Sequence, residues 1–200
     1  MYALEPPIDV HTSARRLFGD RVAADGNFVA DNFASWFGES KVVERDGTPL
    51  RLFHGTTKDF ESFDKRKHRG WATNNMLGMF FTRHAGSASD YACKLSGANV
   101  RPVYLSLRNP YVQNVYEWQA MQGSSLWSIE RVRVWKRDLV KSGFDGVVDS
   151  VGVEFIAFRP EQIKSAIGNS GVFDPLSPSL CDEHGWDEAP AQVERERMRA

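Results

Sequence analysis

The sequence predicts one α+β domain in which short strands and short amphipathic helices alternate along the chain. Two patterns indicate this class. Short apolar runs bounded by turn residues predict strands, and apolar residues spaced at i, i+3 and i+4 predict helices between them. At 200 residues, 42% of them hydrophobic, the chain is long enough to bury one core.

The first part of the chain predicts two helices and a hairpin. Residues 12–18 open with threonine and serine, which favour the start of a short helix. Residues 33–37 carry aromatic side chains at i, i+3 and i+4, and the glycine that follows is typical of a helix end. The runs 41–44 and 50–54 flank an Asp-Gly dipeptide, which indicates a β-hairpin whose second strand leads into His-Gly-Thr-Thr.

The rest of the chain predicts further strands and helices, followed by a peripheral wrap from residue 168. Residues 153–158 are apolar on both parities, the pattern of a strand covered on both faces. The other expected elements are a strand at 77–82, a helix with the stripe Ala88, Tyr91, Ala92 and Leu95, a strand at 103–107 ended by Asn109-Pro110, a helix with the stripe Val132, Trp135 and Leu139 capped by Gly143, and a strand at 144–148.

We expect the domain to occupy residues 30–178, with an N-terminal extension at 1–29 and a charged tail at 179–200. A polar connection follows the hairpin and contains a run of basic residues at 65–69. Such a loop is usually solvated. The alternative is a flexible flap over a ligand, whose cations, together with Trp71, would meet phosphates or an acidic acceptor.

Charge and cysteine content exclude several classes of protein. Lysine and arginine number 25 against 26 acidic residues, so no global field directs the chain to nucleic acid or to an anionic membrane. Cys93 and Cys181 stand in no metal-ligand pattern, which argues against a disulfide framework and against a zinc site. No apolar run is long enough to span a membrane, and no signal-peptide core is visible. We expect a protein that is cytoplasmic where it is made, or that is delivered into a target cell without a removable signal peptide.

Glu154 is the first candidate for chemistry because it interrupts an apolar strand. A lone buried carboxylate is costly unless it is paired or protonated, so a position of this kind usually opens to a cleft. The alternative is a glutamate at the wet end of the strand, or one paired with an arginine.

The other candidates are weaker when each is taken alone. His54 ends a strand, where an isolated histidine is more often structural than functional. Tyr91 lies on an apolar helix stripe, which is more typical of core packing. Ser87 and Ser89 flank the expected helix start, where they would cap it. The order of these residues along the chain is more informative than any one of them.

That order resembles the ADP-ribosyltransferases of the diphtheria-toxin and poly(ADP-ribose)-polymerase side of their superfamily, whose signature is His–Tyr–Glu. Residues 52–56, Leu-Phe-His-Gly-Thr, match the first motif. Met-Phe-Phe at 79–81 followed by Ser-Ala-Ser-Asp-Tyr at 87–91 is similar to the second, and 153–158 is similar to the glutamate strand. Over about residues 30–178 the chain resembles the ADP-ribosyltransferase modules of phage and mobile-element polyvalent proteins, a likeness specific in its full order.

The resemblance implies a split β-sandwich, in which two small sheets with flanking helices enclose a cleft for NAD as a substrate, without a metal. The Gly55 backbone would pair with the nicotinamide carboxamide, and Phe80 and Tyr91 would stack on the ring. The residues implied to bind NAD are His54, Gly55, Thr56, Phe80, Ser87, Ser89 and Tyr91.

The residues implied to be catalytic are His54, Tyr91 and Glu154. His54 would hydrogen-bond a ribose hydroxyl of the adenosine half. Glu154 would bond the 2′-hydroxyl of the nicotinamide ribose and face the positive charge that develops as the glycosidic bond breaks.

The chain departs from the family pattern at two positions. Phe80 stands where polymerase-like members commonly carry the first tyrosine, so a ring is kept and its hydroxyl is lost. Gly152 lies two residues before Glu154, where arginine-specific enzymes of the other superfamily branch carry glutamate or glutamine. Transfer to arginine by that arrangement is therefore not expected.

The function implied first is a mono-ADP-ribosyltransferase that modifies a protein or a nucleic acid, as a bacterial or phage toxin or effector. One alternative is an NAD glycohydrolase toxin, with water as the acceptor. Another is an inactive module that binds NAD or a partner protein, although the retained His54 and Glu154 argue against it. An RNA 2′-phosphotransferase is less favoured, because its basic phosphate-binding pattern is not evident.

Overall fold

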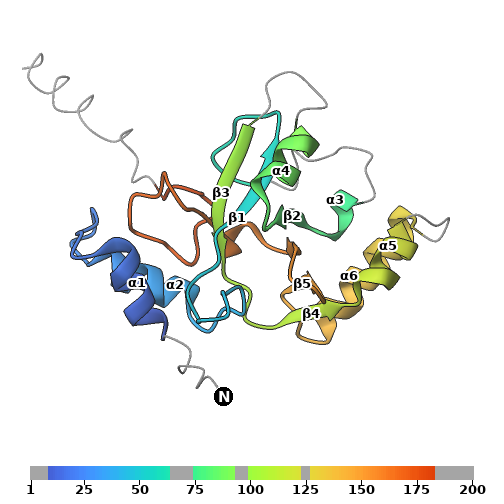
Figure 1. Cartoon of the computed structure of the whole chain (residues 1–200), viewed down its shortest axis with the longest axis horizontal. Helices are drawn as coiled ribbons and strands as arrows, with labels where there is room; N and C mark the ends of the chain where they lie inside the picture. The colour runs from blue at the N-terminus through green and yellow to red at the C-terminus, as the bar shows by residue number, and fades with distance from the viewer. Residues whose placement is uncertain (1–8, 64–73, 93–98, 123–126, 183–200) are drawn as a thin grey trace, which may run out of the picture.

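The computed structural model describes residues 9–63, 74–92, 99–122 and 127–182, and it is an α+β fold (Figure 1). The basic run at 65–69 and Trp71 lie outside the described residues. The helices are α1 (Val10–Phe18), α2 (Val29–Phe37), α3 (Asn74–Leu77), α4 (Ala85–Ala92), α5 (Val115–Gln122) and α6 (Ile129–Lys141). The strands are β1 (Leu52–Thr56), β2 (Met79–Thr82), β3 (Asn99–Leu105), β4 (Pro110–Gln113), β5 (Gly146–Asp149), β6 (Glu154–Ala157) and β7 (Ile163–Ser165).

The strands form one seven-stranded sheet in the order β4-β5-β6-β2-β1-β3-β7. Only β4 and β5 are parallel neighbours, and the other pairs are antiparallel. The junction between β1 and β2 is narrow, because it rests on the single register pair Phe53–Thr82. The described strands therefore form one sheet and not the two separate sheets that the resemblance implies. The weakly paired junction between β2 and β1 is called the seam below.

Each face of the central sheet packs against a different part of the chain. On one face, Leu52, Phe81 and Phe155 belong to a core that also buries Phe63 and Leu180. On the other face, a second cluster packs helices α3, α5 and α6 on β5 and β6; it contains Leu77, Trp118, Val132, Leu139, Val147, Ile156 and Phe158. The sequence expectation that residues 153–158 are covered on both faces is thus confirmed.

Helix α4 lies against β1 and contacts β2 and β3 as well. Its close approach depends on Gly55, because a Cβ atom there would lie 1.9 Å from the carbonyl oxygen of Ala88. Ala88 and Ala92 are the buried residues of α4. Small residues on both elements therefore set the distance between helix and strand.

The packed part of the chain is larger than the expected 30–178. In the N-terminal extension, the Phe18 ring lies 5.1 Å from the Phe33 ring, so α1 packs on α2. In the expected tail, Leu180 is 2% exposed, and its N–H donates to the carbonyl of Glu61 at 2.8 Å. Packing therefore continues past residue 178, since Leu180 is buried and the Ser170 hydroxyl donates to the carbonyl of Asp182.

A buried ion pair fixes this C-terminal segment. Lys164 Nζ lies 2.5 Å from a carboxylate oxygen of Asp182, and the two side chains are 0% and 2% exposed. The ammonium also donates to the carbonyls of Ser177 and Ser179 at 3.0 Å each. All three donors of the lysine are therefore satisfied, and burial lowers the pKa of Lys164.

Several element boundaries differ from the sequence expectation. Helix α1 begins before Thr12, because Asp9 caps it and accepts from the N–H groups of His11 and Thr12. Leu77 ends helix α3 instead of starting a strand. Pro110, expected only to end a strand, opens β4; a proline is tolerated there because β4 is an edge strand.

The turn of the hairpin expected before β1 is confirmed. Its first strand, expected at 41–44, is reduced to one isolated β-bridge. Glu44 donates its N–H to the Thr48 carbonyl, and Val43 and Pro49 form an isolated β-bridge. Gly47 has φ +88°, which suits the glycine of the Asp-Gly dipeptide. The turn therefore depends on local chemistry, while regular pairing begins only at β1.

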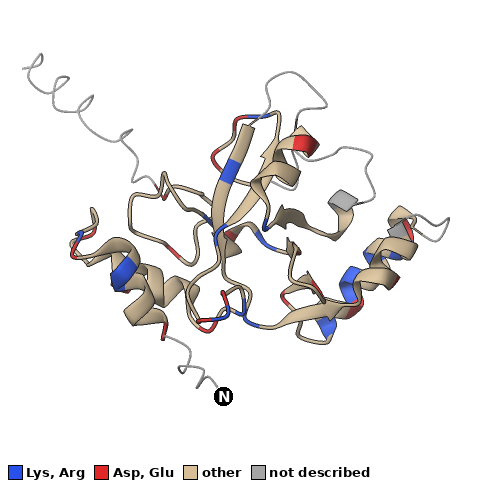
Figure 2. Ribbon diagram, viewed as in Figure 1, with Lys and Arg blue, Asp and Glu red and all other residues tan. Residues whose placement is uncertain are grey.

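Lysine, arginine, aspartate and glutamate residues are spread along the described chain, and helix α6 carries several lysines and arginines (Figure 2). Most parts of the described chain therefore carry both positive and negative residues, as the whole sequence does. Among the described residues, no helix has the length and apolar character needed to cross a membrane.

Replacement of Gly55 tests the contact between α4 and β1. Gly55→Ala should destabilise the protein by about 3 kcal/mol, because the new methyl group meets a backbone oxygen that cannot move alone. Gly86→Ala is the matched control, since a Cβ atom there meets nothing within 4 Å and alanine favours a helix by about 0.5–1 kcal/mol. Urea denaturation measures both, and equal effects would contradict the packing described.

Candidate active site

Glu154 begins β6, the strand next to β2, and lies one strand away from the seam between β2 and β1. Its register partner in β2 is Thr82, and the partner of Thr82 in β1 is Phe53. Directly opposed residues share a sheet face, so the three side chains lie in one row on the face that carries α4 and α5. The glutamate is thus placed between the two helices.

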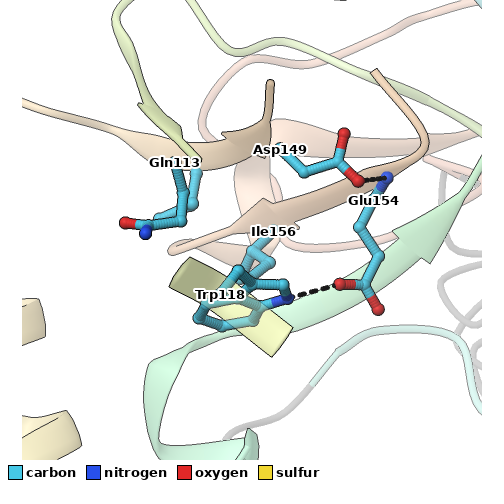
Figure 3. Close-up of a pocket in the computed structure, with 6 residues that line it drawn as sticks. Gln113, Trp118, Asp149, Glu154 and Ile156 are labelled. Carbon is cyan, nitrogen blue, oxygen red and sulfur yellow. Dashed lines mark hydrogen bonds between the residues drawn. The ribbon is translucent and has the colours of Figure 1, made fainter. Parts of the chain in front are cut away.

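Two contacts fix the carboxylate and its backbone. The indole Nε1–H of Trp118 donates to Glu154 Oε2 at 2.7 Å, and the carboxylate of Asp149 accepts the N–H groups of Val153 and Glu154 at 2.8 and 3.0 Å (Figure 3). Glu154 makes no ion pair with a lysine or arginine of the described chain. Its partner is therefore a neutral donor, rather than the arginine considered from the sequence.

The turn before Glu154 requires its glycine. Gly152 has φ +69°, in the left-handed region, and its N–H donates to the Asp149 carbonyl at 3.0 Å. A residue with a side chain would be strained at this position. The absence of glutamate or glutamine two residues before Glu154 thus has a structural cause.

A small cavity of about 10 Å³ adjoins the carboxylate (Figure 3). This volume is close to the space that one water molecule needs. The cavity is lined by Gln113, Trp118, Val147, Asp149, Glu154 and Ile156. The carboxylate is thus half-buried beside a small cavity and not in bulk solvent.

Burial raises the pKa of Glu154 above its ordinary value of 4.5. The hydrogen bond from Trp118 acts in the opposite direction and lowers this pKa, and the negative charge of Asp149 raises it. Desolvation is the largest of the three effects, so the net direction is upward.

His54 occupies the gap that opens between β1 and β2. Its Nδ1 lies 2.8 Å from the carbonyl oxygen of Phe80, and because a carbonyl only accepts, Nδ1 carries the proton. The ring stands edge-on to Phe63, with 4.8 Å between centroids. The Phe80 carbonyl therefore fixes the ring orientation, and in the neutral form of the imidazole Nε2 is the hydrogen-bond acceptor.

The structure does not place His54 and Glu154 on one face. Side chains alternate along a strand, so His54 lies on the opposite face from Phe53 and from the row that contains Glu154. A short network nevertheless joins the two. His54 bonds the Phe80 carbonyl, the Phe80 ring stacks on Trp118 at 6.3 Å, and Trp118 bonds Glu154.

The two residues implied to clamp a nicotinamide ring lie on different elements, Phe80 on β2 and Tyr91 on α4. Tyr91 is 67% exposed on α4, while Ala88 and Ala92 of the same helix are buried. Phe80 is half-buried, and its ring lies nearly parallel to the indole of Trp118, at an angle of 23°. Trp118 is therefore a stacking partner of Phe80.

The polar residues near the motif have local roles in the described chain. Thr56 accepts the N–H of Lys58 on its hydroxyl at 3.1 Å, which shapes the turn after β1. Ser87 is exposed and Ser89 is half-buried. Helix α4 begins at Ala85, so both serines lie within the helix instead of capping its start.

Sequence reasoning missed Trp118 because it did not predict α5. A signal for that helix is present. The side-chain oxygen of Asn114 accepts the N–H groups of Tyr116 and Glu117 at 3.0 and 3.3 Å, and an asparagine followed three residues later by glutamate is a helix-start pattern.

The raised pKa of Glu154 predicts a pH-dependent stability difference between the wild type and Glu154→Gln. Between pH 4.5 and the raised value, the native state keeps a proton that the unfolded chain has released, so stability falls as the pH rises through this window. The variant does not titrate there and should gain stability relative to the wild type as the pH rises from 4.5 through the raised pKa of Glu154. Urea titrations across this range measure it, and a constant difference would contradict the burial of the carboxyl.

Comparison with known proteins gives one structural and one family match. A solved structure described as a crystal structure of an anti-CRISPR protein aligns at 16% identity with a TM-score of 0.31, over 55% of this chain and 89% of that chain. A TM-score this low does not indicate a shared function. No curated protein matches the chain.

Residues 44–173 match the family model described as ADP-ribosyltransferase in polyvalent proteins, and this stretch contains β1, α4, α5 and Glu154. The chain therefore belongs to the ADP-ribosyltransferase family of polyvalent proteins.

Proposed function

We propose that the protein is a mono-ADP-ribosyltransferase that cleaves the nicotinamide–ribose bond of NAD and transfers ADP-ribose to a macromolecular acceptor, a protein or a nucleic acid. The observation that carries this proposal is the Glu154 carboxylate, half-buried at the start of β6 and held by Trp118. It lies within the matched residues 44–173, on the strand that resembles the glutamate strand of the family. As a polyvalent-protein module, the chain would act as an effector or toxin of phage or bacterial origin.

In the proposed reaction the bond between ribose C1′ and the nicotinamide nitrogen breaks, and its electron pair leaves with the nicotinamide. The pyridinium nitrogen becomes neutral, and C1′ takes on positive charge that it shares with the ring oxygen. An acceptor nucleophile then donates an electron pair to C1′ and releases its proton to the solvent. No oxidation or reduction occurs.

Glu154 would stabilise the charge that develops on the ribose. A carboxylate about 4 Å from a unit positive charge, at an effective dielectric constant of about 20, contributes about 4 kcal/mol. This corresponds to about a thousandfold in rate. Because β6 and Trp118 hold the group before substrate arrives, little reorganisation would be needed during the reaction.

The other motif residues would bind the substrate. His54, with its proton on Nδ1, would accept a ribose hydroxyl of the adenosine half on Nε2. The backbone of Gly55 would pair with the nicotinamide carboxamide, beside α4 with Ser87, Ser89 and Tyr91. The absence of a side chain at Gly55 is already required by the packing of α4, so the carboxamide contact is a second role proposed for the same residue.

Charge removal at Glu154 tests the catalytic role. Glu154→Gln should lower nicotinamide release from NAD by about a thousandfold, because the electrostatic stabilisation is lost while the hydrogen-bond acceptor for Trp118 remains. The dissociation constant for NAD should change by no more than about threefold, since the group acts on the transition state. Nicotinamide release is followed by chromatography and binding by calorimetry, and a variant with wild-type turnover would refute the mechanism.

Transfer to a macromolecule is tested with NAD that carries a labelled adenosine half. Incubation in a cell lysate should leave label on a polymer, and separate protease and nuclease digestion then shows whether the polymer is protein or nucleic acid. Label found only as free ADP-ribose would show a glycohydrolase instead. Intact NAD together with measurable NAD binding would show an inactive binding module.

A further inference from the structure

The hydrogen bond between Trp118 and Glu154 is built into a rigid frame. Trp118 is 2% exposed, and aromatic rings surround it. The ring of Trp127 stands perpendicular to it, at 5.1 Å and 87°, and that of Trp135 lies 5.8 Å away. With Phe80 stacked against the indole, the side chain cannot rotate without breaking several contacts.

Trp118 and Glu154 are also linked by hydrogen bonds between the segments that precede them in the chain. Ser150, in the turn that precedes Glu154, accepts the N–H of Val115 on its hydroxyl at 3.2 Å. The N–H of Ser150 donates to the carbonyl of Gln113 at 2.7 Å. The start of α5 is thus bonded to the turn between β5 and β6, which positions Trp118 and Glu154 relative to each other.

The hydrogen bond distinguishes the two carboxylate oxygens. Oε2 accepts from the indole, whereas Oε1 has no donor among the described residues and points away from the indole (Figure 3). An indole N–H only donates, so it restrains the orientation of the carboxylate and cannot itself take up a proton.

We propose that Trp118 is a positioning residue for the reaction: its indole N–H holds Oε2 of Glu154 so that Oε1 faces the ribose of the substrate. This inference rests on the proposed function. Small displacements of a catalytic group cost large factors in rate, and a carboxylate that rotates freely would spend little time in the productive orientation. The protein would thereby supply, from α5, an orienting contact that no family motif in the sequence contains.

Trp118→Phe tests the inference, because it removes the N–H and keeps a ring among the neighbouring aromatic residues. We expect kcat to fall by about 10- to 100-fold with KM for NAD changed by less than about threefold. The acidic limb of the pH–rate profile should move to higher pH, since the bond from Trp118 lowers the pKa of the glutamate. The matched control is Trp135→Phe, which alters the same aromatic cluster without removing the donor to Glu154, and it should retain kcat within about threefold.

Equal losses in the two variants, or a Trp118→Phe variant with unchanged kcat and pH profile, would overturn the inference. If Trp118→Phe does not fold, replacement of Trp118 by β-(3-benzothienyl)alanine removes the N–H at nearly constant shape and gives the same comparison.

A second readout separates this inference from the proposed function. Carbon-13 NMR titration of the Glu154 carboxyl in Trp118→Phe should show a higher midpoint than in the wild type, with or without turnover. A wild-type protein that does not cleave NAD would refute the proposed function. An unchanged midpoint would refute the Trp118 contact on its own.

Discussion

The need to stabilise a carboxylate inside an otherwise apolar strand shapes this structure. Glu154 opens β6, which is packed on both faces, and a charge in such a place is tolerated only with donors and some access to polar surroundings. The chain provides one indole donor, a backbone fixed by Asp149 and a small cavity beside the carboxylate. Helix α5, the turn before β6 and the Phe80 ring all contribute contacts to this arrangement.

The same arrangement accounts for the connection between distant motifs. The histidine of β1 and the glutamate of β6 are on opposite faces of the sheet, yet both are fixed through Phe80, by its carbonyl on one side and its ring on the other. A phenylalanine in place of the family tyrosine keeps both contacts, because neither uses a side-chain hydroxyl. The substitution is therefore compatible with an ordered site.

Much of the fold was predictable, since it depends on local patterns. The aromatic spacing that gives α2, the Asp-Gly turn before β1 and the both-sided burial of β6 are all visible in the sequence. Helix α5 was not predictable from periodicity, because Trp118 is the one fully buried residue among its described side chains and Tyr116 is 78% exposed. The faces occupied by His54 and Glu154 depend on which strands pair and in which register, and residues far apart in sequence do not encode that locally.

The buried pair between Lys164 and Asp182 limits how this domain can be moved between larger polypeptides. A recombination junction placed before residue 180 would leave the Lys164 ammonium in the interior without the Asp182 carboxylate, and it would also remove Leu180 from the core. Exchange of the module in evolution, or its excision in the laboratory, is therefore constrained as far as residue 182. This limit comes from the packing of residues 168–182 on β7, and it is independent of the chemistry at Glu154.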